Sequence, residues 1–235
     1  MAKSIQEDYK TLVDFWNQNF ALEEEEKKQL EETSNDDSWK ELPPSAKLFD
    51  VLTSFKGKEH VLDYGCGSGW GSLVMAKSGV SRVTAVDVAS NSLEMLRCYA
   101  KAYGVDQQIE GIVIDEAWLS KQPKGVYDGL FCSNVIDVVP LEMAKRIVEE
   151  CARVVQEGAF VVFSLNYFIE PEKMAERGAK IDGPHIYLNG VLRLLSLTDL
   201  EWKNLFERFF KDVSLAYFSW PGEAKETRRL FTMKK

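Results

Sequence analysis

Apolar and polar positions along the 235-residue chain follow two periodicities, which predict short buried strands separated by amphipathic helices. Residues 60–64, 82–87, 109–114 and 159–165 are mostly apolar, as expected for strands that helices cover on both faces. A further strand is expected within residues 125–137. The repeated order of strand and helix predicts an α/β fold with a doubly wound, mostly parallel sheet.

Between these strands, apolar residues recur at three- and four-residue steps, which is the spacing of one helix face. The helices expected from this spacing are residues 45–52, 72–77, 92–103, 141–156 and 198–210. Asn91 is expected to cap the third of them, Gly158 to end the fourth and Thr198 to cap the fifth.

The first part of the chain precedes the first strand and predicts an N-terminal helical extension, residues 1–42, ahead of a main domain, residues 43–235. Residues 4–33 are expected to be helical because apolar side chains recur on one face: Ile5, Tyr9, Leu12, Val13, Trp16 and Phe20. Such a face must be buried, either against the main domain or against a second copy of the chain in a homodimer.

The last part of the chain also departs from the alternation. Residues 166–197 interrupt it with several prolines and glycines. Residues 213–220 and 228–233 are expected to be two strands joined by a turn at residues 221–223. These two strands predict an antiparallel hairpin at the C-terminus.

Composition narrows the classes of function. Hydrophobic residues make up 45% of the chain, enough for a large core. The formal net charge is −8 and no basic stripe is visible, so nucleic acid is not the expected partner. No apolar run approaches the roughly 20 residues of a membrane span. Four scattered cysteines form no C-x-x-C pair, and no metal-ligand spacing is present, which suits a cytoplasmic protein without a metal.

A glycine-rich turn follows the first expected strand, with four glycines within residues 65–71. Glycine permits positive φ and lets a ligand approach the backbone, while the following helix start offers free N–H groups. The dinucleotide fingerprint G-x-G-x-x-G does not fit, because Trp70 or Ser72 stands where it needs glycine when started at Gly65 or Gly67.

An acidic residue, Asp87, ends the strand expected at residues 82–87, 18 residues beyond Gly69. A carboxylate in this place can accept hydrogen bonds from both hydroxyls of a ribose. Val88 follows it and is expected to flank an adenine ring. The turn and the acid together predict a nucleotide-type cofactor.

The turn resembles motif I of the class I S-adenosylmethionine-dependent methyltransferases, which has the form acidic-x-G-x-G-x-G. Asp63, Gly65, Gly67 and Gly69 match that form at every position. The resemblance covers about residues 45–235. It implies S-adenosylmethionine as the cofactor and a seven-stranded sheet that the C-terminal hairpin completes. It also implies that the N-terminal extension lies over the cofactor and that the interruption after the fifth strand recognises the substrate.

The resemblance also assigns roles to segments after the strands. Residues 115–117 stand in the family's adenine-contacting segment, and residues 132–135 would line the methionine end of the cofactor, mainly through the backbone. The pattern and the resemblance together give these cofactor-binding candidates: Trp16, Asp63, Gly65, Cys66, Gly67, Gly69, Asp87, Val88, Asp115, Glu116, Ala117, Cys132, Ser133 and Asn134.

The expected activity is in-line methyl transfer to a small-molecule acceptor, which depends mainly on positioning and desolvation. Many members of the family carry histidine where Asp137 stands. Asp137, His185 and Tyr187 are therefore the candidates for taking a proton from the acceptor, beside the alternative that all three are structural. Two other functions stay open: an NAD-type dinucleotide-binding oxidoreductase and a non-catalytic cofactor-binding module.

Overall fold

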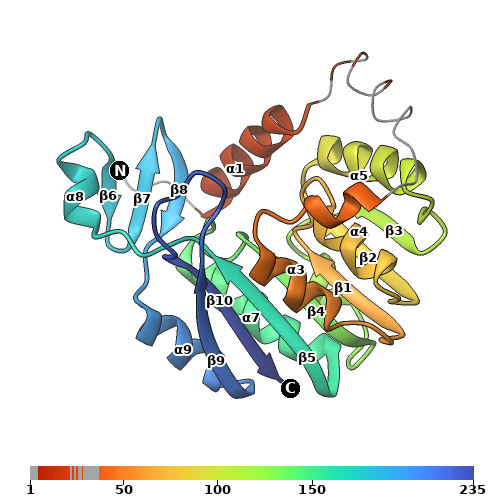
Figure 1. Ribbon diagram of the computed structural model, residues 1–235. Coiled ribbons are helices and arrows are strands. Elements are labelled where there is room, and N and C mark those ends of the chain that lie inside the picture. Colours follow the sequence, from red (N-terminus) through yellow and green to blue (C-terminus); the bar gives the residue numbers. More distant parts are fainter. Residues whose placement is uncertain (1–4, 22, 24, 26–27, 29–36) are drawn as a thin grey trace.

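The computed structural model describes residues 5–21, 23, 25, 28 and 37–235. Its main sheet contains β1 (His60–Tyr64), β2 (Arg82–Asp87), β3 (Ile109–Val113), β4 (Tyr127–Ser133), β5 (Val155–Leu165), β9 (Lys211–Phe218) and β10 (Arg228–Lys234). Within the described residues the strand order is β3-β2-β1-β4-β5-β10-β9. The first five strands are parallel, whereas β10 runs antiparallel to β5 and β9. The predicted seven-stranded sheet with a C-terminal antiparallel hairpin is confirmed (Figure 1).

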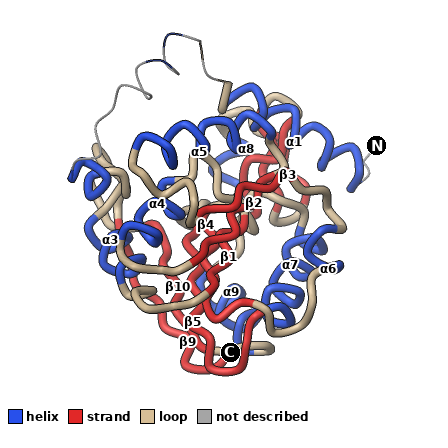
Figure 2. The backbone as a smooth tube through the Cα atoms, turned by 90° about the vertical axis from the view of Figure 1, so that its right-hand side faces the viewer, coloured by secondary structure: helices blue, strands red, loops and turns tan. Residues whose placement is uncertain are grey.

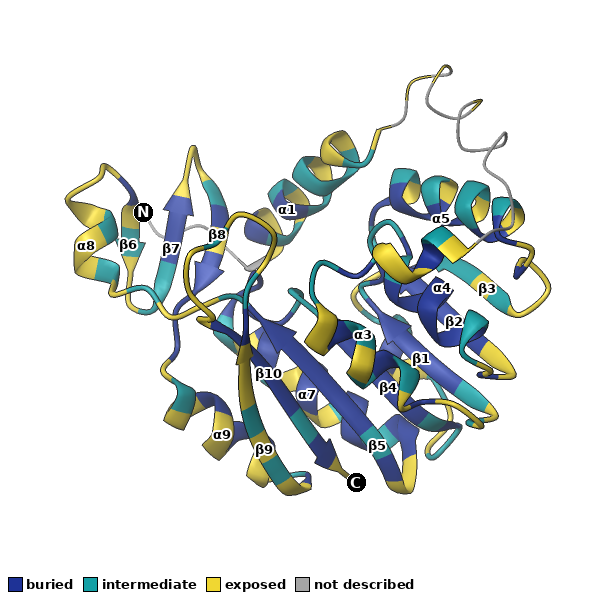
Figure 3. Ribbon diagram, in the orientation of Figure 1, coloured by how far each residue is buried: buried dark blue, intermediate teal, exposed yellow. Residues whose placement is uncertain are grey.

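Helices cover both faces of this sheet, as parallel strands joined by crossovers require. One face carries α3 (Ala46–Thr53), α4 (Trp70–Lys77) and α5 (Ser90–Ala102), and the other carries α6 (Trp118–Lys121), α7 (Leu141–Val154) and α9 (Asp199–Glu207), as Figure 2 shows. The central strands are therefore buried along most of their length (Figure 3). In the part of the chain that is described, no helix has the length and apolarity to cross a bilayer.

The N-terminal helix α1 (Ile5–Asn19) ends before residues 20, 21 and 23, which are not helical, whereas residues 25 and 28 of the expected helix are helical. The expected helix over residues 4–33 also includes positions 4, 22, 24, 26–27 and 29–33, which lie outside the described residues. Asn17, near the end of α1, holds the helix against α5: its Oδ1 accepts a hydrogen bond from Asn91 N (3.3 Å), and its carbonyl accepts one from Asn91 Nδ2 (2.8 Å).

The prediction that Asn91 caps α5 is wrong, because the Asn91 side chain bonds to Asn17 of α1 instead. Ala89 occupies the N-cap position, and Asn91 lies inside the first turn with its side chain bonded to α1. The helix begins two residues earlier than predicted because Asn17, a side chain from a distant part of the chain, bonds the N–H group in its first turn.

The end of α7 also differs from the prediction. The helix stops at Val154 and β5 begins directly at Val155, so Gly158 does not end the helix. Gly158 instead lies in the strand at φ 78°, where the pairing register with β4 shifts, and its N–H donates to the Lys235 carbonyl (3.0 Å). Thr198 does cap α9 as predicted, in a capping box with Glu201.

Residues 166–197, which follow β5, fold into a small unit outside the main sheet. It contains α8 (Pro171–Ala175) and the antiparallel strands β6 (Lys180–Asp182), β7 (His185–Leu188) and β8 (Val191–Leu195). Figure 1 places this three-stranded sheet beside α1, away from the main sheet. The sequence did not predict these strands, because each is only three to five residues long.

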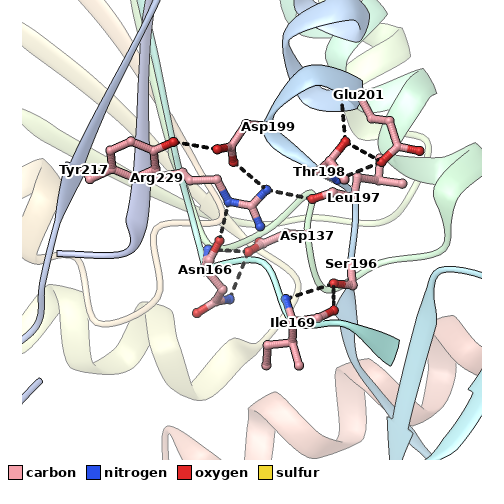
Figure 4. A network of polar contacts seen from close by, with 10 residues as sticks. All are labelled: Asp137, Asn166, Ile169, Ser196, Leu197, Thr198, Asp199, Glu201, Tyr217 and Arg229. Carbon is pink, nitrogen blue, oxygen red and sulfur yellow. Dashed lines mark hydrogen bonds and ion pairs between the residues drawn. The ribbon is translucent and has the colours of Figure 1, made fainter. Parts of the chain in front are cut away.

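A buried arginine joins this unit to the main sheet. Arg229 on β10 is fully buried, and its Nε donates to the Asn166 carbonyl (2.8 Å), just after β5. Its Nη1 donates to the Leu197 carbonyl (2.7 Å) and lies 3.4 Å from a carboxylate oxygen of Asp199 (Figure 4). Arg229 therefore fixes both ends of residues 166–197 to the last strands of the sheet.

We expect Arg229→Met to lower the free energy of unfolding by about 3 kcal/mol, because it removes these bonds and the positive charge near the buried carboxyl of Asp137. Lys234→Met is the control, since Lys234 lies on the same strand but is largely exposed and pairs loosely with Asp212 at 3.4 Å. Urea unfolding of both variants checks this. Equal stability of the two would contradict the assigned role.

Candidate active site

A cavity of about 710 Å³ lies at the carboxyl ends of β1, β2 and β4. In an open parallel sheet this edge is where ligands bind, because the connecting loops and helix starts converge there. The cofactor candidates that line the cavity are Trp16, Asp63, Gly65, Cys66, Gly67, Asp87, Val88, Asp115, Glu116, Ala117, Ser133 and Asn134. Gly69 and Cys132 are absent from its described lining.

The glycine turn is fixed by the acid at the end of β2. Asp87 Oδ2 accepts a hydrogen bond from Gly67 N (2.9 Å), and Oδ1 accepts one from Ala89 N (2.9 Å). Burial raises the pKa of the Asp87 carboxyl, and these two bonds oppose that rise. Each carboxylate oxygen retains a further acceptor site, so the group can bind a ligand while it holds the turn.

The two candidates that do not line the cavity have packing roles. Gly69 has φ 82°, and a Cβ built on it would lie 2.1 Å from Leu96 Cδ1, so it allows α4 to pack closely on α5. Cys132 is fully buried within β4. Gly65 combines both functions, since it lines the cavity while a Cβ there would lie 2.1 Å from Val135 Cγ2.

Asp63, the first acid of the motif, is buried beneath the turn. Its Oδ2 accepts a hydrogen bond from Ser72 Oγ (2.6 Å), which ties the first turn of α4 to the end of β1. Burial is the main cause that raises the pKa of Asp63 to about 7, with a smaller contribution from the negative charge of Asp87. Near neutral pH this carboxyl exists in both protonation states.

Aromatic side chains of the N-terminal segment form the roof of the cavity. Tyr9, Trp16 and Phe20 line it, and the rings of Trp16 and Phe20 are stacked with centroids 5.9 Å apart. A Cβ built on Gly67 would lie 3.2 Å from Phe20 Cζ, so the roof meets the glycine turn directly. Burial and the charge of Glu116 raise the pKa of Tyr9 to about 12, which keeps its hydroxyl protonated.

The three predicted acid–base residues lie elsewhere: none appears in the described lining of the cavity. Asp137 is fully buried, and its Oδ2 accepts hydrogen bonds from Asn166 N (2.6 Å) and Asn166 Nδ2 (2.9 Å), as Figure 4 shows. His185 Nε2 accepts a bond from Leu141 N (3.0 Å) at the start of α7, and its Nδ1 lies 2.9 Å from the Asp182 carbonyl.

Tyr187 likewise makes a contact within the fold. It is buried, and its hydroxyl donates to Asp8 Oδ2 (2.9 Å), which joins β7 to α1. Burial raises the pKa of the Tyr187 hydroxyl above the ordinary value for tyrosine. In this arrangement Asp137, His185 and Tyr187 connect elements around the cavity, and the structure favours the structural alternative for all three.

Sequence reasoning did not identify several residues that line the cavity. Tyr9 and Phe20 were part of the predicted apolar face of α1, so the spacing of that face could have assigned them. Val138 and Met143 follow β4, and no motif in the sequence marks them as cavity residues. Trp220 comes from the loop between β9 and β10, where no periodic pattern marks it.

The raised pKa of Asp63 predicts a pH dependence of stability. Between about pH 4 and pH 7 the folded protein retains a proton on Asp63 that the unfolded chain has lost. The contribution of this group is therefore greatest below pH 4 and decreases by about 1.4 kcal/mol per pH unit as the pH rises towards 7.

Asp63→Asn should remove this contribution while it preserves the acceptor for Ser72. Thermal unfolding between pH 5 and pH 8 should show the variant gaining stability relative to the unsubstituted protein as the pH rises. A difference between the two proteins that does not change with pH would contradict the assignment.

The glycine turn and the strands around it match a family model described as a methyltransferase domain, over residues 61–158. The ubiquinone biosynthesis O-methyltransferase of Bordetella avium is 34% identical over 115 residues, which are 49% of this chain and 45% of that protein. The corresponding protein of Cronobacter sakazakii is 34% identical over 51% of this chain and 48% of that protein. The chain thus spans about half the length of these curated relatives.

Solved structures share the fold at low sequence identity. The 1,6-didemethyltoxoflavin-N1-methyltransferase of Burkholderia thailandensis has a TM-score of 0.64 at 16% identity, over 85% of this chain and 81% of that one. A methyltransferase from Mesorhizobium loti has a TM-score of 0.59 at 22% identity, over 80% of this chain and 96% of that one. With the strand order, these findings show that residues 61–158 match a methyltransferase domain and that the chain has the fold of these solved methyltransferases.

Proposed function

We propose that this protein transfers a methyl group from S-adenosylmethionine to a small-molecule acceptor. The observation that carries the proposal is the cavity at the carboxyl ends of β1, β2 and β4, which brings together the glycine turn, Asp87 and the segments after β3 and β4. These groups come from four separate parts of the chain. Their convergence on one cavity supports a single binding site for an elongated nucleoside.

In the proposed arrangement, Asp87 binds the ribose hydroxyls, and Val88 with residues 115–117 encloses the adenine. The backbone of the glycine turn and the loop after β4 holds the methionine end. S-adenosylmethionine would supply the methyl group on a sulfonium, which is already a good leaving group. The protein residues then have to orient the two reactants and exclude water.

The charges around the cavity support a cationic ligand. Acids outnumber cations in its described lining, where Arg146 is the one Lys or Arg beside six Asp and Glu residues: Asp63, Asp87, Asp115, Glu116, Glu149 and Glu150. Carboxylates in a partly enclosed site attract positive charge such as that of a sulfonium and an ammonium group. The protonated hydroxyl of Tyr9 lies among the same acids and can donate a hydrogen bond to a ligand.

The relatives support a small acceptor. The curated relatives are O-methyltransferases of ubiquinone biosynthesis, and the Burkholderia enzyme was solved with bound 1,6-didemethyltoxoflavin and S-adenosylhomocysteine. We therefore infer a small organic acceptor for this chain as well. Methylation of an oxygen atom is the finer proposal that the curated relatives favour.

Asp87→Ala should weaken cofactor binding by about 2–4 kcal/mol, because the charge-assisted bonds to the ribose and the support of Gly67 are lost together. Calorimetry with S-adenosylhomocysteine checks the affinity, and methyl-labelled S-adenosylmethionine added to a metabolite extract checks transfer. Glu110→Ala is the control, since Glu110 lies on β3 and pairs with Arg82 at the surface. Unchanged affinity in Asp87→Ala, or tighter binding of NAD than of S-adenosylhomocysteine, would contradict the proposal.

We further propose that the N-terminal extension, residues 1–42, acts as a lid over the cofactor. Trp16→Ala combined with Phe20→Ala should weaken S-adenosylhomocysteine binding at least tenfold, because both rings line the roof and would no longer exclude water. Val13→Ala is the control, because Val13 lies on the same helix but does not belong to the described lining of the cavity.

Calorimetry and size-exclusion chromatography should accompany both variants. Full affinity in the double variant would contradict the lid. A change of oligomeric state with unchanged affinity would favour the homodimer as the partner of this helix face.

A further inference from the structure

A tryptophan at the edge of the cavity is held in place although much of it is exposed. Trp220 lies in the loop of residues 219–227, lines the cavity and keeps 37% of its surface accessible. Large aromatic side chains on loops ordinarily lose exposed area by packing or remain mobile. Trp220 is instead fixed by three separate contacts with Glu223 and Arg228.

Glu223 makes the first two contacts, one through its carboxylate and one through its backbone N–H, and both fix the backbone of Trp220. Glu223 Oε2 accepts a hydrogen bond from Trp220 N (2.8 Å), and Glu223 N donates to the Trp220 carbonyl (3.1 Å). The same carboxylate accepts a bond from Arg228 Nε (2.9 Å) through Oε2 and one from Arg228 Nη2 (2.7 Å) through Oε1. This pairing lowers the pKa of Glu223, so the carboxylate stays ionised and the loop keeps its shape.

The third contact is a stack. The guanidinium carbon of Arg228 lies 3.7 Å from the centroid of the Trp220 ring. Arg228 is itself buried and is held from its other side, because its Nη1 donates to Asn166 Oδ1 (2.6 Å). With one face of the indole covered by the guanidinium, the ring offers its other face or its edge to the cavity.

The side chain that holds Arg228 also reaches the floor of the cavity. Asn166 Oδ1 accepts a second hydrogen bond, from Asn134 Nδ2 (3.0 Å), while buried Asp137 fixes the Asn166 amide through its N and Nδ2 groups. Asn134 lines the cavity directly after β4 in the left-handed conformation, φ 55°, which asparagine adopts more readily than most residues other than glycine. The amide of Asn166 therefore sets the positions of Asn134 and Trp220 together.

We propose that Trp220 is the stacking wall of the acceptor subsite and that the acceptor presents a flat, conjugated ring to it. The inference rests on the proposed methyl transfer, since it assigns the part of the cavity next to the loop after β4 to the acceptor. An indole with one face immobilised by a guanidinium favours a planar partner, because aromatic rings gain contact area and quadrupole attraction in offset stacks. A ring held against Trp220 would keep its reacting atom near Asn134.

The experiment compares two probes with the same carbon skeleton, 2-naphthol and decahydro-2-naphthol, on protein saturated with S-adenosylhomocysteine. The saturated probe is the more hydrophobic of the two, so a preference for 2-naphthol reports stacking and not apolar burial. We expect 2-naphthol to bind about fivefold more tightly, measured by ligand-observed NMR titration. Trp220→Leu should abolish this preference, whereas Trp220→Phe should retain most of it.

Phe168→Leu is the control, because Phe168 is as exposed as Trp220 but does not belong to the described lining of the cavity. It should leave the preference unchanged. Equal binding of the two probes, binding of neither, or an unchanged preference in Trp220→Leu would overturn the stacking wall. Failure of S-adenosylhomocysteine itself to bind would instead overturn the proposed function, so the two failures are distinguishable.

Discussion

At the carboxyl end of β2, one buried carboxylate accepts hydrogen bonds from the backbone on both sides of the cavity floor. Asp87 bonds Gly67 N in the turn after β1 and Ala89 N at the start of α5. Gly65 N and Cys66 N also donate to the Val86 carbonyl (2.8 and 2.9 Å), so the end of β2 holds the turn through both its backbone and the Asp87 carboxylate. The turn held in this way is the surface against which Phe20 of the roof packs.

A second polar centre holds the other side of the cavity. Asp137 and Arg229 are both fully buried, and Asn166 bonds to each of them, through its N and Nδ2 groups to Asp137 and through its carbonyl to Arg229. Asp137 Oδ1 and Arg229 Nη2 have no hydrogen-bond partner among the described residues, so the bonds to Asn166 are a main part of what stabilises these two buried groups. The centre joins β10, the small sheet and the loop after β4, so the proposed acceptor side of the cavity depends on residues that do not themselves line it.

The sequence predicted the parts of the fold that follow from periodicity and turn chemistry. The apolar runs located β1 to β5, and the glycine pattern with Asp87 located the floor of the cavity. Predictions failed where a distant segment decides the local structure. Asn91 does not cap α5 because Asn17 bonds there, and the position of Trp220 depends on a stack with Arg228 that no spacing in the sequence indicates.

In the proposed arrangement, the glycine turn and Asp87 together bind the nucleoside of S-adenosylmethionine. The most direct test is a crystal structure of the protein with S-adenosylhomocysteine. We expect both ribose hydroxyls within hydrogen-bond distance of the Asp87 carboxylate, with the sulfur atom next to the loop that carries Asn134. A nucleoside bound elsewhere, or in this cavity with its ribose away from Asp87, would contradict the proposed role of Asp87.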